Sequence, residues 1–110
     1  MNLEGKAFNS TLMSSYIAMF HSARAILIHD GVREKSHYCI ARYLEAKYAD
    51  RGLLEPLWVQ RLDQYRDLRH ADQYDTGFHA TKDEAVEALK VAGEFVERMR
   101  KLLETRNGKA

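Results

Sequence analysis

Residues that interrupt or cross-link a chain are scarce in this sequence. Its 110 residues include one proline, six glycines and one cysteine. The lone Cys39 excludes an internal disulfide, and the rarity of proline and glycine favours long helices. No apolar run approaches the roughly 20 residues that span a bilayer, because His21, Arg24 and His29 interrupt the most apolar segment. No charged-then-apolar leader follows Met1, so the sequence predicts a cytoplasmic protein without a membrane partner.

An excess of charge of one sign is also absent. Lysine and arginine total 17 against 16 aspartate and glutamate, a formal net charge of +1. Such a balance gives no global field that would attract nucleic acid or a membrane surface. Binding of an anion must therefore depend on a local cluster of basic residues.

Four helices are predicted from the spacing of apolar residues and from their end signals. The first covers about residues 8–29 and stops at Asp30-Gly31, and the second follows an N-cap at Ser36 and ends near residue 50. The third has Pro56 in its first turn and extends from residue 58 to about 73, and the fourth begins at the capping box of residues 81–84. The sequence thus predicts an all-α, antiparallel up-and-down four-helix bundle. It forms a single domain, residues 1–110, with a core of about 8–104.

The first predicted helix is apolar on two flanks. One stripe contains Leu12, Tyr16, Phe20 and Leu27, and a second lies beside it and includes Ile17 and Ile28. A face this wide indicates burial against more than one neighbour. Two interpretations remain open: a second copy of the chain covers the surplus, or it fills an asymmetric core.

Basic, acidic, imidazole and phenol groups are concentrated at residues 65–75. The spacing places four of them on one helical face: Arg66, Arg69, His70 and Gln73. Guanidinium groups bind phosphate oxygens, and a histidine can take or return the proton of a ribose hydroxyl. The alternative is a solvated helix face on which Asp67 and Asp72 pair with Arg66 and Arg69.

Motifs for metals and cofactors are missing. None of the five histidines occurs in a metal-binding spacing, and Cys39 has no neighbouring ligand. No glycine-rich loop joins a strand to a helix. We therefore expect neither a metal nor a cofactor.

Three segments together resemble the small prokaryotic HEPN-domain proteins. They are residues 15–27 (SYIAMFHSARAIL) followed by Gly31, the turn Lys35-Ser36-His37, and residues 69–74 (RHADQY). The likeness covers most of residues 9–104. It implies an all-α bundle that forms a homodimer, often encoded beside an MNT-type nucleotidyltransferase as a toxin–antitoxin pair. Members of this family usually have an additional helix before the first run, so the resemblance implies that this chain lacks it.

The resemblance also implies a site. Active family members are metal-independent endoribonucleases with an arginine, a polar follower, and a histidine four to six residues beyond the arginine. Here Arg69 and His70 match the first two, and Tyr74 stands in the histidine's place. The implied catalytic residues are therefore Arg69, His70 and Tyr74. The implied binding residues are Arg66, Asp72, Gln73, Ser36 and His37.

Two functions follow from this resemblance. In the first, the Arg69 face lines a groove at the subunit interface that recognises RNA or a nucleotide in a toxin–antitoxin or defence system, and cleavage of RNA is left open. In the second, it is a catalytically inactive HEPN subunit that binds an MNT-type nucleotidyltransferase, with Tyr74 or its neighbours as the contacted or modified part. The absent histidine favours the second.

Overall fold

The computed structural model describes the backbone of residues 3–74 and 79–106, and the side chains of residues 6–71 and 79–106. The helices are α1 (Leu3–His29), α2 (His37–Leu44), α3 (Pro56–Tyr74) and α4 (Lys82–Arg106), and a π-helical segment, Glu45–Ala49, continues α2. The described part contains no strand, so the all-α prediction is confirmed. The first helix begins at Leu3, earlier than the predicted residue 8.

Helix ends follow the local chemistry that the sequence indicated. The Ser36 hydroxyl accepts a hydrogen bond from the Cys39 amide at 3.3 Å and caps α2. Thr81 and Glu84 exchange side-chain to backbone hydrogen bonds of 2.8 and 3.1 Å at the start of α4. Gly31 has a φ of +82° after α1, a conformation that favours glycine. These predicted caps and stops are confirmed.

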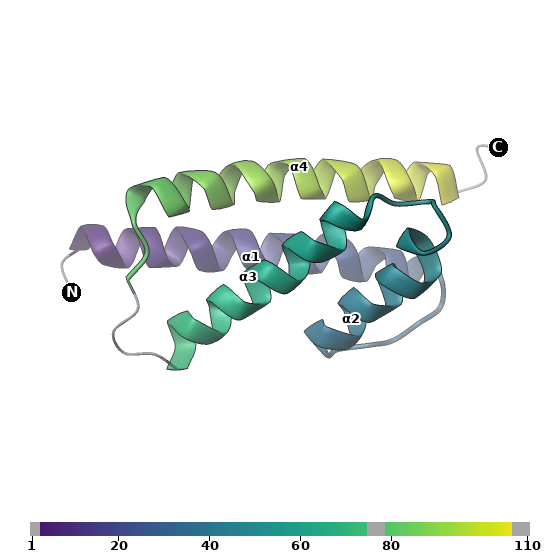
Figure 1. Ribbon diagram of the computed structural model, residues 1–110, viewed down its shortest axis with the longest axis horizontal. Coiled ribbons are helices and arrows are strands. Elements are labelled where there is room, and N and C mark those ends of the chain that lie inside the picture. The colour runs from purple at the N-terminus through teal and green to yellow at the C-terminus, as the bar shows by residue number, and fades with distance from the viewer. Residues whose placement is uncertain (1–2, 75–78, 107–110) are drawn as a thin grey trace.

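The directions of the helices differ from a simple up-and-down order (Figure 1). Helices α1 and α4 pack most extensively and run the same way, while α3 crosses them in the opposite direction. The segment from residue 30 to residue 36 returns along α1 instead of turning tightly, so α2 also follows the direction of α1. This return places the start of α2 beside the middle of α1.

The core lies between α1, α3 and α4 and continues under α2. Its largest fully buried side chains include Tyr16, Met19, Leu27, Leu44, Tyr48, Leu62, Phe95 and Met99. The predicted stripe of α1 is buried, which confirms it. The second stripe is partly buried at Met13, which packs against the core, while Ile17 and Ile28 remain 44% and 62% exposed. The interpretation that the whole stripe fills an asymmetric core is therefore wrong.

Within the described residues, no helix combines the length and apolar character needed to cross a membrane.

Candidate functional site

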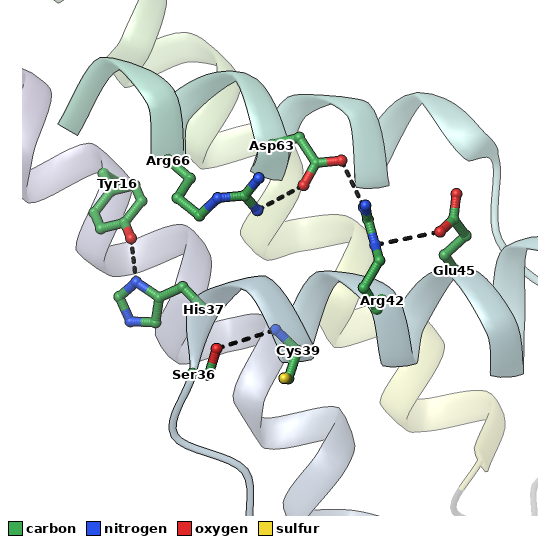
Figure 2. A network of polar contacts seen from close by, with 8 residues as sticks. All are labelled: Tyr16, Ser36, His37, Cys39, Arg42, Glu45, Asp63 and Arg66. Carbon is green, nitrogen blue, oxygen red and sulfur yellow. Dashed lines mark hydrogen bonds and ion pairs between the residues drawn. The ribbon is translucent and has the colours of Figure 1, made fainter. Parts of the chain in front are cut away.

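Tyr16 of α1 and His37 of α2 form a hydrogen bond at the point where the two helices meet (Figure 2). The bond joins the Tyr16 hydroxyl to Nδ1 of His37. Phe20, one turn after Tyr16, stacks on the imidazole with ring centroids 4.2 Å apart and an interplanar angle of 17°. The ring of His37 is therefore fixed from two sides, and the residue is half-buried.

Two arginines of α3 approach the same place. The Cζ atom of Arg69 lies 5.5 Å from the ring centroid of Tyr16, and that of Arg66 lies 5.3 Å from the ring of Tyr38. Both distances are those of cation–π contacts. We call Tyr16, Phe20, His37, Arg66 and Arg69 the His37 cluster. It draws one or two residues from each of α1, α2 and α3.

An ion-pair network fastens α3 to α2 beside the cluster (Figure 2). Asp63 accepts a hydrogen bond from Arg66 at 2.7 Å and one from Arg42 at 2.5 Å. The Nε atom of Arg42 also lies 3.2 Å from Glu45. The alternative in which Arg66 pairs with Asp67 is wrong, because Arg66 turns back to Asp63 and Asp67 is exposed. Asp63 thus holds Arg66 in place from one side.

The environment of His37 favours its neutral form. Burial lowers the pKa of the imidazole, and the positive groups Arg69, Arg24, Arg66 and His21 lower it further. Because a neutral imidazole keeps one acceptor nitrogen, a His37 that donates from Nδ1 to Tyr16 can accept a proton at Nε2. This tautomer is assigned from the chemistry.

The phenol of Tyr16 stays protonated at neutral pH. Burial raises its pKa, and this effect outweighs the opposing charges of Arg69 and Arg66. The hydroxyl can therefore act only as a hydrogen-bond partner, which makes Tyr16 a positioning residue for His37.

Stability should depend on pH through His37. Because its pKa lies below that of an exposed histidine, the unfolded chain takes up the proton at a higher pH than the folded chain. The free energy of unfolding should therefore decrease as the pH falls below about 6.5. The charged and titratable groups that face the ring are on α1 (Tyr16, His21, Arg24) and on α3 (Arg66, Arg69).

Urea denaturation between pH 7 and pH 5 measures this effect. His37→Gln should lose less stability than the native chain over that interval. The exposed His79 serves as the control, and His79→Gln should keep the native dependence. Equal slopes for the native chain and His37→Gln would contradict the assignment.

The structure brings three of the predicted site residues together: His37, Arg66 and Arg69. Ser36 is exposed, and its hydroxyl caps α2 directly before His37. His70 is exposed on α3. The side chains of the remaining three, Asp72, Gln73 and Tyr74, lie outside the described residues.

Two cluster residues were not predicted from the sequence to belong to a site. Tyr16 and Phe20 were assigned to the core stripe of the first helix, which is correct for their burial but omits their contacts with His37. Tyr16 and His37 are 21 residues apart, so no local spacing in the sequence indicates that they are in contact. The only signal is their joint presence in the segments that carry the family resemblance.

Among the residues that the structure describes, no group of three or more histidine, cysteine, aspartate or glutamate side chains could hold a metal ion.

The fold and the site together define a class of protein. It is an all-helical protein in which a histidine and two arginines lie close together between three helices. Residues 1–102 match the family model of the HEPN domain, so the chain belongs to the HEPN-domain family. A relative in Methanocaldococcus jannaschii, "Putative toxin MJ0605", is 27% identical over 100 residues, which cover 91% of this chain and 74% of that protein. No solved structure matches the chain.

Proposed function

We propose that this HEPN-domain protein is the RNA-cleaving component of a toxin–antitoxin system and acts as a metal-independent endoribonuclease. The family and the name of the M. jannaschii relative support the toxin part of the proposal. The observation that carries the chemistry is the placement of a neutral, oriented His37 beside Arg66 and Arg69. These are the groups that transfer a ribose proton and hold a phosphodiester.

The reaction divides among a few side chains. His37 takes the proton of a ribose 2′-hydroxyl at Nε2, while Tyr16 holds Nδ1. The 2′ oxygen then bonds to phosphorus, the bond from phosphorus to the 5′ oxygen breaks, and His70 returns a proton to that oxygen. Arg69 stabilises the charge that develops on the phosphate oxygens. The products are a 2′,3′-cyclic phosphate and a 5′-hydroxyl end.

This division modifies the roles inferred from the sequence, in which His70 was a catalytic residue and His37 was a binding residue. The fixed ring and lowered pKa of His37 support that residue as the base. His70 is exposed and follows Arg69 directly, so we assign to it the protonation of the leaving 5′ oxygen. Tyr74 keeps its predicted catalytic role, and Asp72 and Gln73 keep their predicted binding roles, as part of the proposal.

Incubation of the purified protein with structured RNA and excess EDTA tests the proposal. We expect cleavage that resists the chelator and leaves cyclic phosphate ends. Arg69→Ala should reduce the rate about 100- to 1,000-fold, the usual effect of removing one group that stabilises transition-state charge. Lys90→Ala removes an exposed cation from α4, which contributes nothing to the His37 cluster, and should cleave at the native rate.

Intact RNA at high protein concentration would contradict the enzyme. Co-purification with a nucleotidyltransferase, or a nucleotide mass added to Tyr74, would then favour the inactive HEPN subunit. Equal rates for Arg69→Ala and Lys90→Ala would place any cleavage outside the cluster.

We also propose that the chain works as a homodimer with an MNT-type nucleotidyltransferase as its further partner. Exposed apolar side chains on α4 support association of two copies, since Val86, Leu89 and Val96 recur at helical spacing on its surface.

A further inference from the structure

One largely exposed face of α1 carries two basic side chains between two apolar ones. Ile17, His21, Arg24 and Ile28 follow at steps of four, three and four residues, so they share this face. It is the second apolar stripe of the sequence, interrupted by two nitrogen-containing side chains. An apolar face that stays exposed within one subunit marks a binding surface for a ligand or a partner.

Two adjoining pockets lie along this face. The first, of about 240 Å³, is lined by Ile17, Phe20, His21, Arg24, His37 and Ile40. The second, of about 590 Å³, is lined by Arg24, Ile28, Gly31, Val32, Arg33 and Lys35. Arg24 belongs to both, and His37 links the first to the His37 cluster. We call the two pockets together the α1 groove.

The charge of the α1 groove identifies its occupant as an anion. Among the described residues, no aspartate or glutamate lines either pocket. Two acids adjoin lining residues along the chain, and both accept hydrogen bonds. Glu34 accepts from the amides of Lys35 and Ser36 at 3.2 and 3.0 Å, and Asp30 accepts from Tyr43 and Tyr48 at 2.8 and 2.6 Å. Two copies of the chain joined through this face would bring like charges together, which disfavours self-association here.

The mixture of groups identifies the kind of anion. Proteins that bind single-stranded nucleic acid combine a basic groove for the backbone with apolar or aromatic surfaces for the bases. The first pocket offers apolar walls from Ile17, Phe20 and Ile40 at a size that suits one base. The second offers Arg24, Arg33 and Lys35, spaced along the groove for phosphates.

We propose that the α1 groove binds the single-stranded RNA that flanks the phosphate held at the His37 cluster. One base occupies the pocket beside His37, and the following phosphates lie along Arg24, Arg33 and Lys35. This inference rests on the proposed function and deepens it, because it assigns the RNA path and gives His37 a place in both sites. It also explains why Ile17 and Ile28 are exposed.

Fluorescence anisotropy with a labelled 12-nucleotide, 2′-O-methylated RNA tests the path, because this RNA has no 2′-hydroxyl to react. The titration is repeated at several KCl concentrations in EDTA. We expect the double variant Arg33→Ala/Lys35→Ala to bind at least about tenfold more weakly. Its slope of log K against log [KCl] should decrease by about 1.4, since each phosphate contact of a single strand contributes about 0.7. Arg24→Ala should shift both quantities in the same direction.

Ile17→Ala separates base contact from charge. It should weaken binding about fivefold, near the lower end of the effect of removing one base contact, and leave the salt slope unchanged. The matched control is Lys90→Ala/Lys101→Ala, which removes two exposed cations from α4 and should bind as the native chain does.

The outcomes separate this inference from the proposed function. The RNA path would be overturned if Arg24→Ala and Arg33→Ala/Lys35→Ala bound RNA as the native chain does. Losses of affinity equal to those of the α4 control would also overturn it. In either case, cleavage of unmodified RNA would still test the proposed ribonuclease. Variants in the α1 groove that abolish association of two copies in gel filtration, with RNA affinity unchanged, would make the face a protein interface and also overturn it. Binding that depends on the α1 groove without cleavage would support the path and reject the ribonuclease.

Discussion

Phe95→Ala is expected to lower the free energy of unfolding by about 3–5 kcal/mol, the range for removing a fully buried aromatic ring. Phe95 has no exposed surface and lies in the core cluster that unites α1, α3 and α4. Its ring meets that of Trp58 edge to face, with centroids 5.9 Å apart. Alanine would leave a cavity between α4 and α3 that the rigid helices can close only in part.

Urea denaturation followed by circular dichroism measures this loss. The nearby Glu94 provides the control because it is exposed on the same helix. Glu94→Ala should cost less than about 1 kcal/mol, as surface substitutions do. Similar losses for the two variants would show that α4 does not pack through Phe95.

Asp30→Ala is expected to cost about 3 kcal/mol, because hydrogen bonds to a charged group contribute about 1.5–3 kcal/mol each and the two part-buried ones from tyrosines are lost, besides an exposed one from His29. The Asp30 carboxylate follows α1 and accepts hydrogen bonds from Tyr43 at 2.8 Å and from Tyr48 at 2.6 Å. Tyr48 is buried, so its hydroxyl would lose its partner without gaining full hydration. These bonds fix the end of α1 to α2 and its π-helical continuation.

The hydrogen bond between Asp30 and Tyr48 shifts the pKa values of these two residues in opposite directions. Burial alone would raise the pKa of Asp30, but hydrogen bonds from Tyr48 and Tyr43 outweigh it and the pKa lies below its usual value. Burial and the hydrogen bond to Asp30 raise the pKa of Tyr48 to about 12. The stabilisation by Asp30 is therefore complete above the ordinary carboxyl pKa and is lost as the pH falls through the lowered one.

Thermal unfolding of Asp30→Ala and of Asp50→Ala checks the assignment. Asp50 is exposed at the end of the π-helical segment, so its loss should be small. At pH 7 the Asp30 variant should unfold roughly 10 °C or more below the control, given about 4 °C per kcal/mol for a domain of this size. Asp30→Asn, which keeps one oxygen acceptor, should lie between them. Coincident transitions would contradict the role of Asp30.

The features predicted correctly depend on near neighbours in the chain. The cap at Ser36, the capping box of Thr81 and Glu84, and the stop at Gly31 each involve contacts over a few residues. The burial of the α1 core stripe follows from helical periodicity in the same way. Such signals are visible in one dimension because a helix fixes which positions share a face.

The features that were missed join distant segments. The hydrogen bond of Tyr16 and His37 and the ion pair of Arg42 and Asp63 each span 21 residues. Helical periodicity placed Arg66 and Arg69 on one face but could not say that Asp63 would join Arg66 to Arg42 of α2. The same limit applies to the direction of α2, which depends on how the segment after Gly31 returns along α1.

The sequence by itself determined four helices and the ends marked by caps and glycine, because local hydrogen bonding and the spacing of apolar residues act within a few turns of the chain. Only the tertiary structure decided that His37 meets Tyr16 beside the arginines of α3, and that Ile17 and Ile28 stay exposed along a basic groove. The physical reason is that these arrangements depend on how separate helices pack. That packing minimises exposed apolar surface and unpaired buried polar groups over the whole molecule.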